Sequence, residues 1–305
     1  MEFQSLKLFL DITQTHSFIR SAENNYMSAS TLTRHIQRIE QELGQPLFIR
    51  DNRQVRLTEA GEKFLLFAKQ SWSDWQQLQQ QLSPVQGQLE GELKVFCSVT
   101  AAYSHLPQIL EQFRQAHPKV EIKLSTGDPA QAVHTVHSFE ADISLTGKPE
   151  HLPNSIVFHY IDDIHLSIIA PRVACVATQY LQQQPIDWQN IPFILPVDGP
   201  VRKRIDRWFK ELKIREPKIY ATVAGHEAIV PMVALGFGVA LLPDVVIKHS
   251  PMNNQVSYLK LADPISPFEL GICVQEKRLQ EPIIKHFGNC CRKIKDKRSN
   301  LKNFL

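Results

Sequence analysis

The first sixty residues combine short apolar stripes at helical spacing with residues that favour turns. Leu6, Phe9 and Leu10 recur three or four positions apart and predict a first helix. Ser17 can accept a hydrogen bond from the first turn of a second, shorter helix. The Asn-Asn-Tyr run at 24–26 tolerates turn conformations and ends that helix. We therefore expect two short helices, the second of which ends in a tight turn.

A third helix is predicted from Ser28 to Leu43, where Gly44 stops it. Its apolar side chains fall on one face, and the other face carries hydroxyl, amide and guanidinium groups with no acid before Glu40. Such groups hydrogen-bond base edges and phosphates, whereas an ordinary solvated helix usually mixes Glu with Lys. The residues expected to contact DNA are Ser28, Ser30, Thr31, Thr33, Arg34, Gln37 and Arg38.

Two short β-type runs come next, at 46–50 and 53–57, and an Asp-Asn pair joins them. This arrangement predicts a hairpin. Arg50 and Arg53 lie on it and suit contact with a phosphate or with the minor groove. Residues 1–58 are thus expected to form a winged helix-turn-helix domain that binds DNA.

Residues 59–91 are expected to form a linker, in which a long helix capped by Thr58 leads to a hinge containing glycine. The apolar positions of this helix have the spacing of a coiled coil and are Leu65, Ala68, Trp72, Trp75, Leu78 and Leu82. One interpretation is a core helix packed on its own domain. We favour a homodimer seam, because the helix lies between two domains and its large apolar residues lack a local partner.

From residue 92 onward, short apolar runs alternate with helical patterns. Repeated β-α-β units of this kind predict an α/β domain over 92–305, with two lobes and mainly parallel sheets. We expect lobe one over about 92–162 and 267–305, and lobe two over about 163–266. Such lobes bind ligands in the cleft between them, where strands end and helices begin.

That rule selects the candidate ligand-binding residues Ser98, Thr100, Gly127, Lys148, Asp198, Arg202, His226 and Glu227. The Ser98 and Thr100 hydroxyls suit a carboxylate. Lys148 and Arg202, together with several helix N-termini, predict a small anionic ligand. The alternative is that Ser98 and Asp198 merely cap helices and that the two cations are solvated.

The composition adds few constraints. A chain of 305 residues with 43% apolar residues suits two or three domains, and a net charge of +3 identifies no partner. Five cysteines without Cys-x-x-Cys spacing predict neither a metal site nor a cofactor. The absence of a signal peptide and of a long apolar run predicts a cytoplasmic protein with no membrane segment. The basic stretch 277–305 is interpreted as a solvated helix end, with nucleic-acid contact as the alternative.

Four runs in the N-terminal region, 17–23, 28–40, 43–48 and 57–61, together resemble the LysR-type transcriptional regulators. The resemblance implies a regulator rather than an enzyme, bound to double-stranded operator DNA. It also implies a two-lobed effector domain of periplasmic-binding-protein type, a tetramer built from two dimers, and RNA polymerase as a further partner. Ala29 departs from the family, which often has Gln or Pro there, so no base contact is assigned to it.

Beyond residue 92 the chain resembles a smaller group within this family. The runs that carry this closer resemblance are 96–107, 121–124, 147–150, 199–202, 219–223 and 267–271. These runs resemble the LysR-type activators of the isoleucine–valine pathway. That resemblance implies activation of the acetohydroxy acid isomeroreductase gene and a response to acetolactate or acetohydroxybutyrate. The alternative is a LysR-type regulator that senses a different small carboxylate.

Two other classes of function remain as hypotheses. In an enzyme, His105, His226 and Glu227 would supply acid–base chemistry and Ser98 a nucleophile, but neither a GxSxG nor an HExxH motif is present. A solute-binding protein of a transporter would share the lobed fold. The DNA-binding head disfavours the transporter hypothesis, and binding to an operator fragment separates all three.

Overall fold

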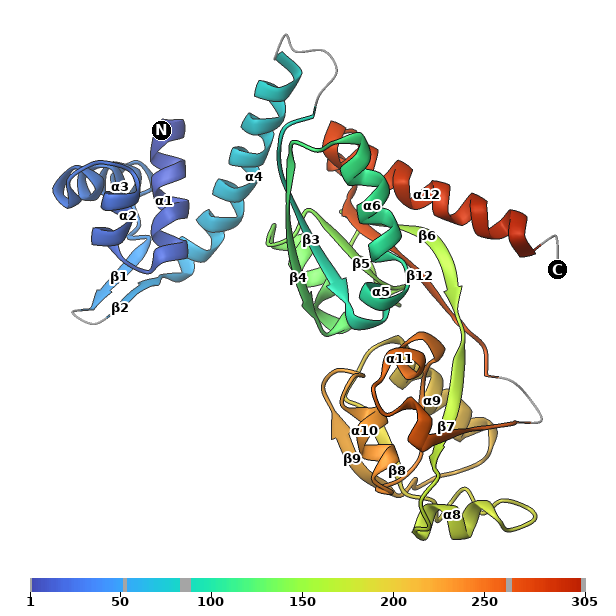
Figure 1. The fold of residues 1–305 in the computed structure, drawn as a ribbon. Coiled ribbons are helices and arrows are strands. Elements are labelled where there is room, and N and C mark those ends of the chain that lie inside the picture. The colour runs from blue at the N-terminus through green and yellow to red at the C-terminus, as the bar shows by residue number, and fades with distance from the viewer. Residues whose placement is uncertain (1, 52–53, 83–88, 262–264, 303–305) are drawn as a thin grey trace. The chain divides into compact units, whose positions relative to one another are not determined.

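The computed structural model describes residues 2–51, 54–82, 89–261 and 265–302. The chain divides into two compact units, Met1–Gly87 and Gln88–Leu305 (Figure 1). Across the described ranges, no helix is long and apolar enough to cross a membrane.

The described part of the first unit consists of α1 (Phe3–Thr15), α2 (Phe18–Asn24), α3 (Ala29–Leu43), β1 (Phe48–Asp51), β2 (Gln54–Leu57) and α4 (Glu59–Leu82). Hydroxyl caps set two helix starts, because Ser17 and Ser28 each accept a backbone N–H three residues ahead. Gly44 ends α3 in the left-handed region at φ 67°. The strands β1 and β2 pair antiparallel, so the predicted order of three helices and a hairpin is confirmed.

The core of this unit lies under α3. Leu32, Ile36 and Ile39 of its predicted apolar stripe are buried, whereas Leu43 at its end is 48% exposed. The Phe9 ring packs on the Phe48 ring at 5.2 Å between centroids. Burial of this stripe leaves the opposite face of α3 directed away from the core.

The long helix α4 contributes to the same core. Ala68 is fully buried in it, and the Trp75 ring stacks on Phe3 with centroids 4.6 Å apart. The expectation that the α4 seam lacks a local partner is therefore wrong as far as Trp75, because α4 packs on α1 up to that residue. Leu78 and Leu82 in its last turns are 44% and 73% exposed.

The second unit contains two lobes. Lobe one has the sheet order β4-β3-β5-β12-β6. Its strands are β3 (Gly91–Ser98), β4 (Val120–Gly127), β5 (Ile143–Gly147), β6 (Ile156–Ile164) and β12 (Phe268–Gln275). Its helices are α5 (Val99–Ser104), α6 (Leu106–Ala116), α7 (Ala132–His137) and α12 (Pro282–Lys302).

Lobe two has the sheets β10-β7-β11 and β8-β9. Its strands are β7 (Leu166–Pro171), β8 (Phe193–Pro196), β9 (Ile219–Val223), β10 (Ala240–Pro243) and β11 (Val256–Leu259). Its helices are α8 (Val176–Leu181), α9 (Pro200–Glu211), α10 (Ile229–Ala234) and α11 (Asp244–His249).

The prediction of mainly parallel sheets is wrong in detail. The pairs β3-β4, β3-β5 and β8-β9 are parallel, but β12 pairs antiparallel with β5 and β6, and β7 pairs antiparallel with β10 and β11. The sequence pattern does not predict the strand β6, because Asp162 and Asp163 interrupt its apolar run. This strand leads directly into β7 and so carries the chain from lobe one to lobe two (Figure 1).

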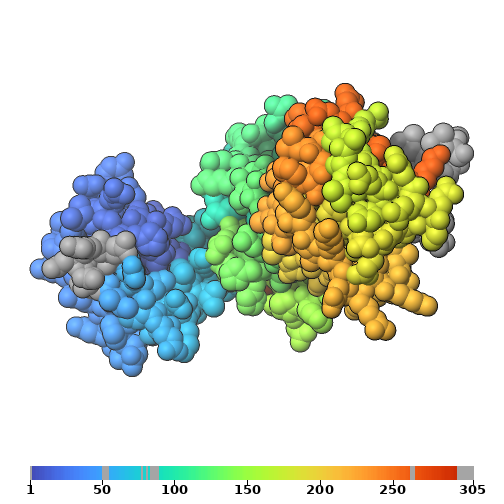
Figure 2. Space-filling view, turned by 90° about the horizontal axis from the view of Figure 1, so that it is seen from below, coloured from blue at the N-terminus to red at the C-terminus, as the bar shows by residue number. Residues whose placement is uncertain are grey.

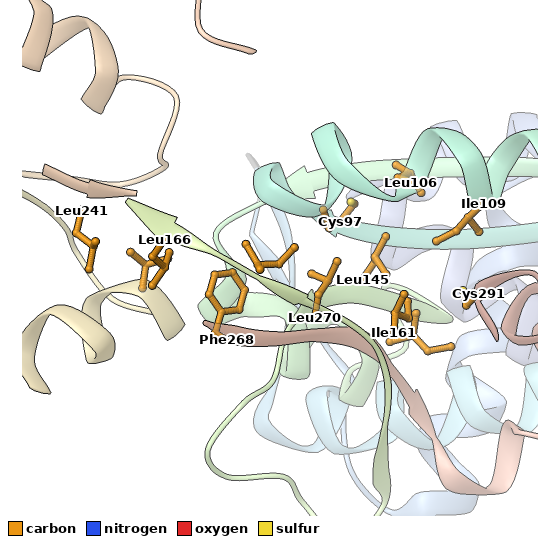
Figure 3. Close-up of a cluster of buried hydrophobic side chains, with 14 of the residues drawn as sticks. Cys97, Leu106, Ile109, Leu145, Ile161, Leu166, Leu241, Phe268, Leu270 and Cys291 are labelled. Carbon is orange, nitrogen blue, oxygen red and sulfur yellow. The ribbon is translucent and has the colours of Figure 1, made fainter. Parts of the chain in front are cut away.

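One hydrophobic core extends through both lobes. Leu241 and Leu166 of lobe two and Leu270 of lobe one belong to a single cluster, and Phe268 lies between them (Figure 3). The lobes also touch where Tyr103 of α5 stacks on His249 of α11, with centroids 5.3 Å apart. In Figure 2 the yellow and orange surface of lobe two meets the green surface of lobe one.

Gly61 gives a test of the packing in the first unit. A Cβ there would overlap the carbonyl oxygen of Leu47, so Gly61→Ala should lower the free energy of unfolding by about 1–3 kcal/mol. The matched control is Gly288→Ala in α12, where the new Cβ would meet Ile272 at an ordinary 3.9 Å. Urea unfolding of the full chain measures both. Equal stability of the two variants would contradict the close approach at Gly61.

Candidate functional site

The predicted DNA-binding side chains of α3 lie on its outer face. Ser28, Ser30, Thr31, Arg34, Gln37 and Arg38 are exposed, and Thr33 is half-buried. A hydrogen bond of 3.0 Å between Ser5 Oγ and His35 Nδ1 joins α1 to α3 on the inner side. The structure thus brings these seven residues onto one helix whose opposite side is fixed in the core.

Some of these groups already have partners within the chain. Ser28 Oγ accepts the backbone N–H of Thr31 at 3.2 Å and lies 2.9 Å from the Ser30 hydroxyl. Arg38 forms an ion pair with Glu2 at 3.1 Å and a longer one with Glu42. Ser28 therefore has a structural role as a cap. Arg34 and Gln37 are exposed on α3, and their contact with base edges stays a prediction.

The hairpin is described only in part. Arg50 lies in β1 opposite Val55, but its side chain is outside the described residues, as is Arg53 as a whole. The prediction that these two arginines contact DNA stays a prediction.

A cavity of about 230 Å³ lies between the lobes of the second unit. It gathers six of the eight residues predicted to bind the effector, namely Ser98, Thr100, Gly127, Asp198, His226 and Glu227. They come from the start of α5 and the end of β4 in lobe one, and from the turns before α9 and α10 in lobe two. Both lobes therefore contribute polar groups to one small enclosure.

The Ser98 and Thr100 hydroxyls lie on the lobe-one wall. Ser98 caps α5 by accepting the backbone N–H of Ala101 at 3.4 Å, so the capping alternative is correct for this residue, although it also lines the cavity. Thr100 is buried, and its Oγ1 lies 3.4 Å from Nδ1 of His226. This contact joins the two lobes across the cavity wall.

His226 is a neutral hydrogen-bonding group in this wall. Its side chain is 6% exposed, and burial lowers its pKa to about 4, although the carboxylates of Glu227 and Asp128 act in the opposite direction. A neutral imidazole can donate through one ring nitrogen and accept through the other. It therefore adds polarity to the cavity without adding charge.

Two predicted residues do not line this cavity. The Arg202 guanidinium binds the Pro196 carbonyl oxygen at 3.1 Å and pairs with Asp206 at 3.0 Å. Lys148 pairs with Glu269 at 2.6 Å and lines a different cavity. The expected supply of positive charge to the effector cavity is therefore not found, because both cations turn toward nearby acceptors.

Three carboxylates line the cavity, and two of them, Asp198 and Glu227, are among the predicted residues, whereas Asp128 is not. Two are engaged by the backbone, since Asp128 accepts the N–H of Ala130 at 2.9 Å and Asp198 that of Gly199 at 2.7 Å. The further lining residues at 196–197 and 223–225 lie at the ends of β8 and β9. The position of these residues at strand ends is the sequence signal for them.

Three of the four residues of the enzyme hypothesis, Ser98, His226 and Glu227, line the cavity. The fourth, His105, does not, and its Nε2 lies 3.2 Å from Asp162 Oδ2 while its Nδ1 lies 2.8 Å from the Ser104 hydroxyl. No cluster of three or more His, Cys, Asp or Glu side chains able to hold a metal occurs in the described ranges. Burial raises the pKa of the Cys97 and Cys273 thiols to about 12, as expected for small core residues.

Burial of His226 predicts a pH-dependent stability. Its pKa is lower in the folded chain than the unfolded value near 6.5, so the unfolded state binds more protons between pH 4 and 6.5. The neutral histidine therefore contributes stability above pH 6.5 that is lost as the pH falls toward 4, by about 3 kcal/mol in full. Urea unfolding of wild type and of His226→Gln across this window should show the difference widening as the pH rises. A pH-independent difference would contradict the burial.

Family models match most of the chain. Residues 3–62 match the bacterial regulatory helix-turn-helix protein of the lysR family, and residues 86–295 match the LysR substrate binding domain. The HTH-type transcriptional activator IlvY of Haemophilus influenzae is 61% identical over 287 residues, which cover 94% of this chain and 98% of the relative. The HTH-type transcriptional regulator IlvY of Escherichia coli is 51% identical over 289 residues, with 94% and 97% covered.

Solved structures share the fold. A full-length OxyR from Pseudomonas aeruginosa superposes with a TM-score of 0.72 at 20% identity, covering 96% of this chain and 95% of that one. Full-length CbnR complexed with its target DNA gives a TM-score of 0.67 at 20% identity, with 96% and 100% covered. Both family models and the near full-length relatives agree, and the chain belongs to the LysR family of transcriptional regulators.

Proposed function

We propose that this protein activates the gene for acetohydroxy acid isomeroreductase and responds to acetolactate or acetohydroxybutyrate. The observation that carries the proposal is the cavity between the lobes, which gathers six of the eight residues predicted to bind an effector. The 61% identity to an activator named IlvY supports the choice of pathway.

The cavity suits a small hydroxy-keto acid. Its volume of about 230 Å³ excludes large ligands. The hydroxyls of Ser98 and Thr100 and the N-terminal amides of α5 can donate to a carboxylate or keto oxygen. The carboxylates of Asp198 and Glu227 in the lobe-two wall can accept from the hydroxyl group of the ligand. The anionic charge of the effector is thus balanced by dipoles rather than by a cation.

The ligand would contact both lobes at once. Thr100 belongs to lobe one and His226 to lobe two, and they meet at 3.4 Å. A molecule that hydrogen-bonds to both stabilises one arrangement of the lobes over others, and its effect is limited to its differential affinity for those arrangements. We propose that this shift changes how paired subunits hold or bend operator DNA.

Dimerisation completes the proposal. The last turns of α4 present Leu78 and Leu82 at high exposure, which suits a contact with a second copy. Two linked heads gain affinity for paired half-sites through effective concentration. We also propose a tetramer of two dimers and a contact with RNA polymerase, and both of these rest on the family resemblance alone.

The acidic lining favours a second candidate. Three carboxylates and no Lys or Arg line the described part of the cavity. This electrostatic environment disfavours a strongly anionic ligand. The second candidate is therefore a LysR-type regulator of another gene that senses a different small carboxylate with more hydroxyl groups.

Arg34→Ala should weaken operator binding by about 1–3 kcal/mol, because the exposed guanidinium would lose its contact to a base edge. Gel-shift titration at fixed salt, on the promoter fragment of the isomeroreductase gene, measures the change. Lys63→Ala is the control, since this exposed cation lies on α4 and pairs with Glu59. If Arg34→Ala binds as tightly as wild type, Arg34 does not read the operator. If wild type binds this fragment no better than an unrelated one, the target gene is wrong.

Thr100→Val should weaken acetolactate binding at least tenfold while leaving operator affinity unchanged, because it removes one cavity hydroxyl at nearly constant volume. Isothermal titration of the full chain measures the change. The control is Thr222→Val on β9, an exposed threonine that does not line the cavity. Absence of acetolactate and acetohydroxybutyrate binding to wild type would leave the second candidate as the better description.

A further inference from the structure

A second and larger cavity lies between the lobes. Its volume is about 520 Å³, and it shares only Pro129 and Asp198 with the effector cavity. Lobe one contributes the residues after β5 and the start of β12, and lobe two contributes the first two turns of α9. Neither the effector site nor the DNA-binding face accounts for this cavity.

Close contacts between the lobes line the second cavity. Gly199 of lobe two has φ 98°, and a Cβ built on it would lie 3.3 Å from Cγ of Pro129 in lobe one. A Cβ on Gly147 would likewise lie 2.7 Å from Cγ of Pro200. The glycine backbone of one lobe therefore packs closely here against a proline ring of the other.

The second cavity carries positive charge from both lobes. Lys148 comes from lobe one, and Lys203, Arg204 and Arg207 come from α9. The acids that line it are Asp198, Glu150 and Glu269. Lys148 pairs with Glu269 at 2.6 Å, and Lys203 pairs with Glu150 at 2.9 Å. Two of the four cationic side chains are thus neutralised by ion pairs within the cavity.

The two arginines remain without an acidic partner in the described part of the chain. Arg204 donates from Nη2 to the Pro267 carbonyl oxygen at 3.0 Å, and its Nε is buried with no acceptor. Arg207 is exposed at the cavity edge. A buried donor without an acceptor is costly, so the Arg204 guanidinium is not fully satisfied within the chain.

The positive charge of the cavity affects the titration of Glu150. The hydrogen bond from Lys203 lowers the pKa of Glu150, and the charges of His151 and Arg207 lower it further. The cavity therefore has a positive potential that its own acids do not cancel at the two guanidinium groups.

We propose that this basic cavity is a second ligand site, which takes a small molecule carrying an oxygen dianion such as a phosphate or a dicarboxylate. The planar guanidinium groups of Arg204 and Arg207 would bind its oxygens, and Lys148 would approach from the opposite lobe. Because the occupant would touch both lobes, its binding stabilises the arrangement in which they are close.

The test uses inorganic phosphate and succinate as probes, titrated into the full chain by calorimetry at constant ionic strength. At least one probe should bind wild type saturably. Arg207→Gln should weaken that binding at least tenfold. Lys210→Gln, the matched control, removes an exposed cation from the same helix outside the cavity and should change it less than twofold.

Three results would overturn the proposal. One is the absence of saturable binding by either probe. Another is equal weakening by Arg207→Gln and Lys210→Gln, which would mean an adventitious ion only. The third is displacement of the bound probe by acetolactate, which would merge the two cavities into one site. Retention of acetolactate binding by Arg207→Gln is expected, so the effector proposal is judged separately.

Discussion

The antiparallel pairing of β12 with β6 is the constraint on which the second unit depends. The strand β6 belongs to the lobe-one sheet and continues into β7 of lobe two after a single intervening residue. The register of this pair shifts between Leu270 and Gly271, beside the buried contact of Asp162 with His105. Because each cavity has walls from both lobes, the geometry of this crossing sets the shape of both.

The interface between the lobes is divided by charge. One cavity is small, lined by hydroxyls and carboxylates, and contains a neutral histidine. The other is larger and is lined by two lysines and two arginines as well as by three carboxylates. Cavities of different charge favour different ligands. With the proposed second site, the same two lobes would distinguish two chemical classes of small molecule.

Local signals in the sequence were sufficient for the first unit. The caps Ser17 and Ser28 and the stripe Leu32–Ile36–Ile39 act within a few residues, so their structures follow from spacing alone. The α4 stripe was ambiguous, because one apolar face can serve its own core or a partner. The packing of Ala68 and of Trp75 decides in favour of its own core as far as Trp75.

In the second unit, spacing predicted where loops meet but not where side chains point. The rule of strand ends correctly placed Thr100 and His226 in one cavity. It placed Arg202 wrongly, because an acid four residues later and a nearby carbonyl oxygen capture the guanidinium. Lys148 is similarly turned by Glu269, a residue more than a hundred positions away in sequence. Long-range pairings of this kind leave no trace in local periodicity.

The contact between Gly199 and Pro129 has a thermodynamic consequence. It is a shared boundary, so any movement of the lobes changes the volumes on both of its sides together. Occupancy of either side then alters the affinity of the other by one common factor, whichever molecule binds first. Two proposed ligands that both hold the lobes together would each raise the affinity of the other, so the response would be greatest when both are present.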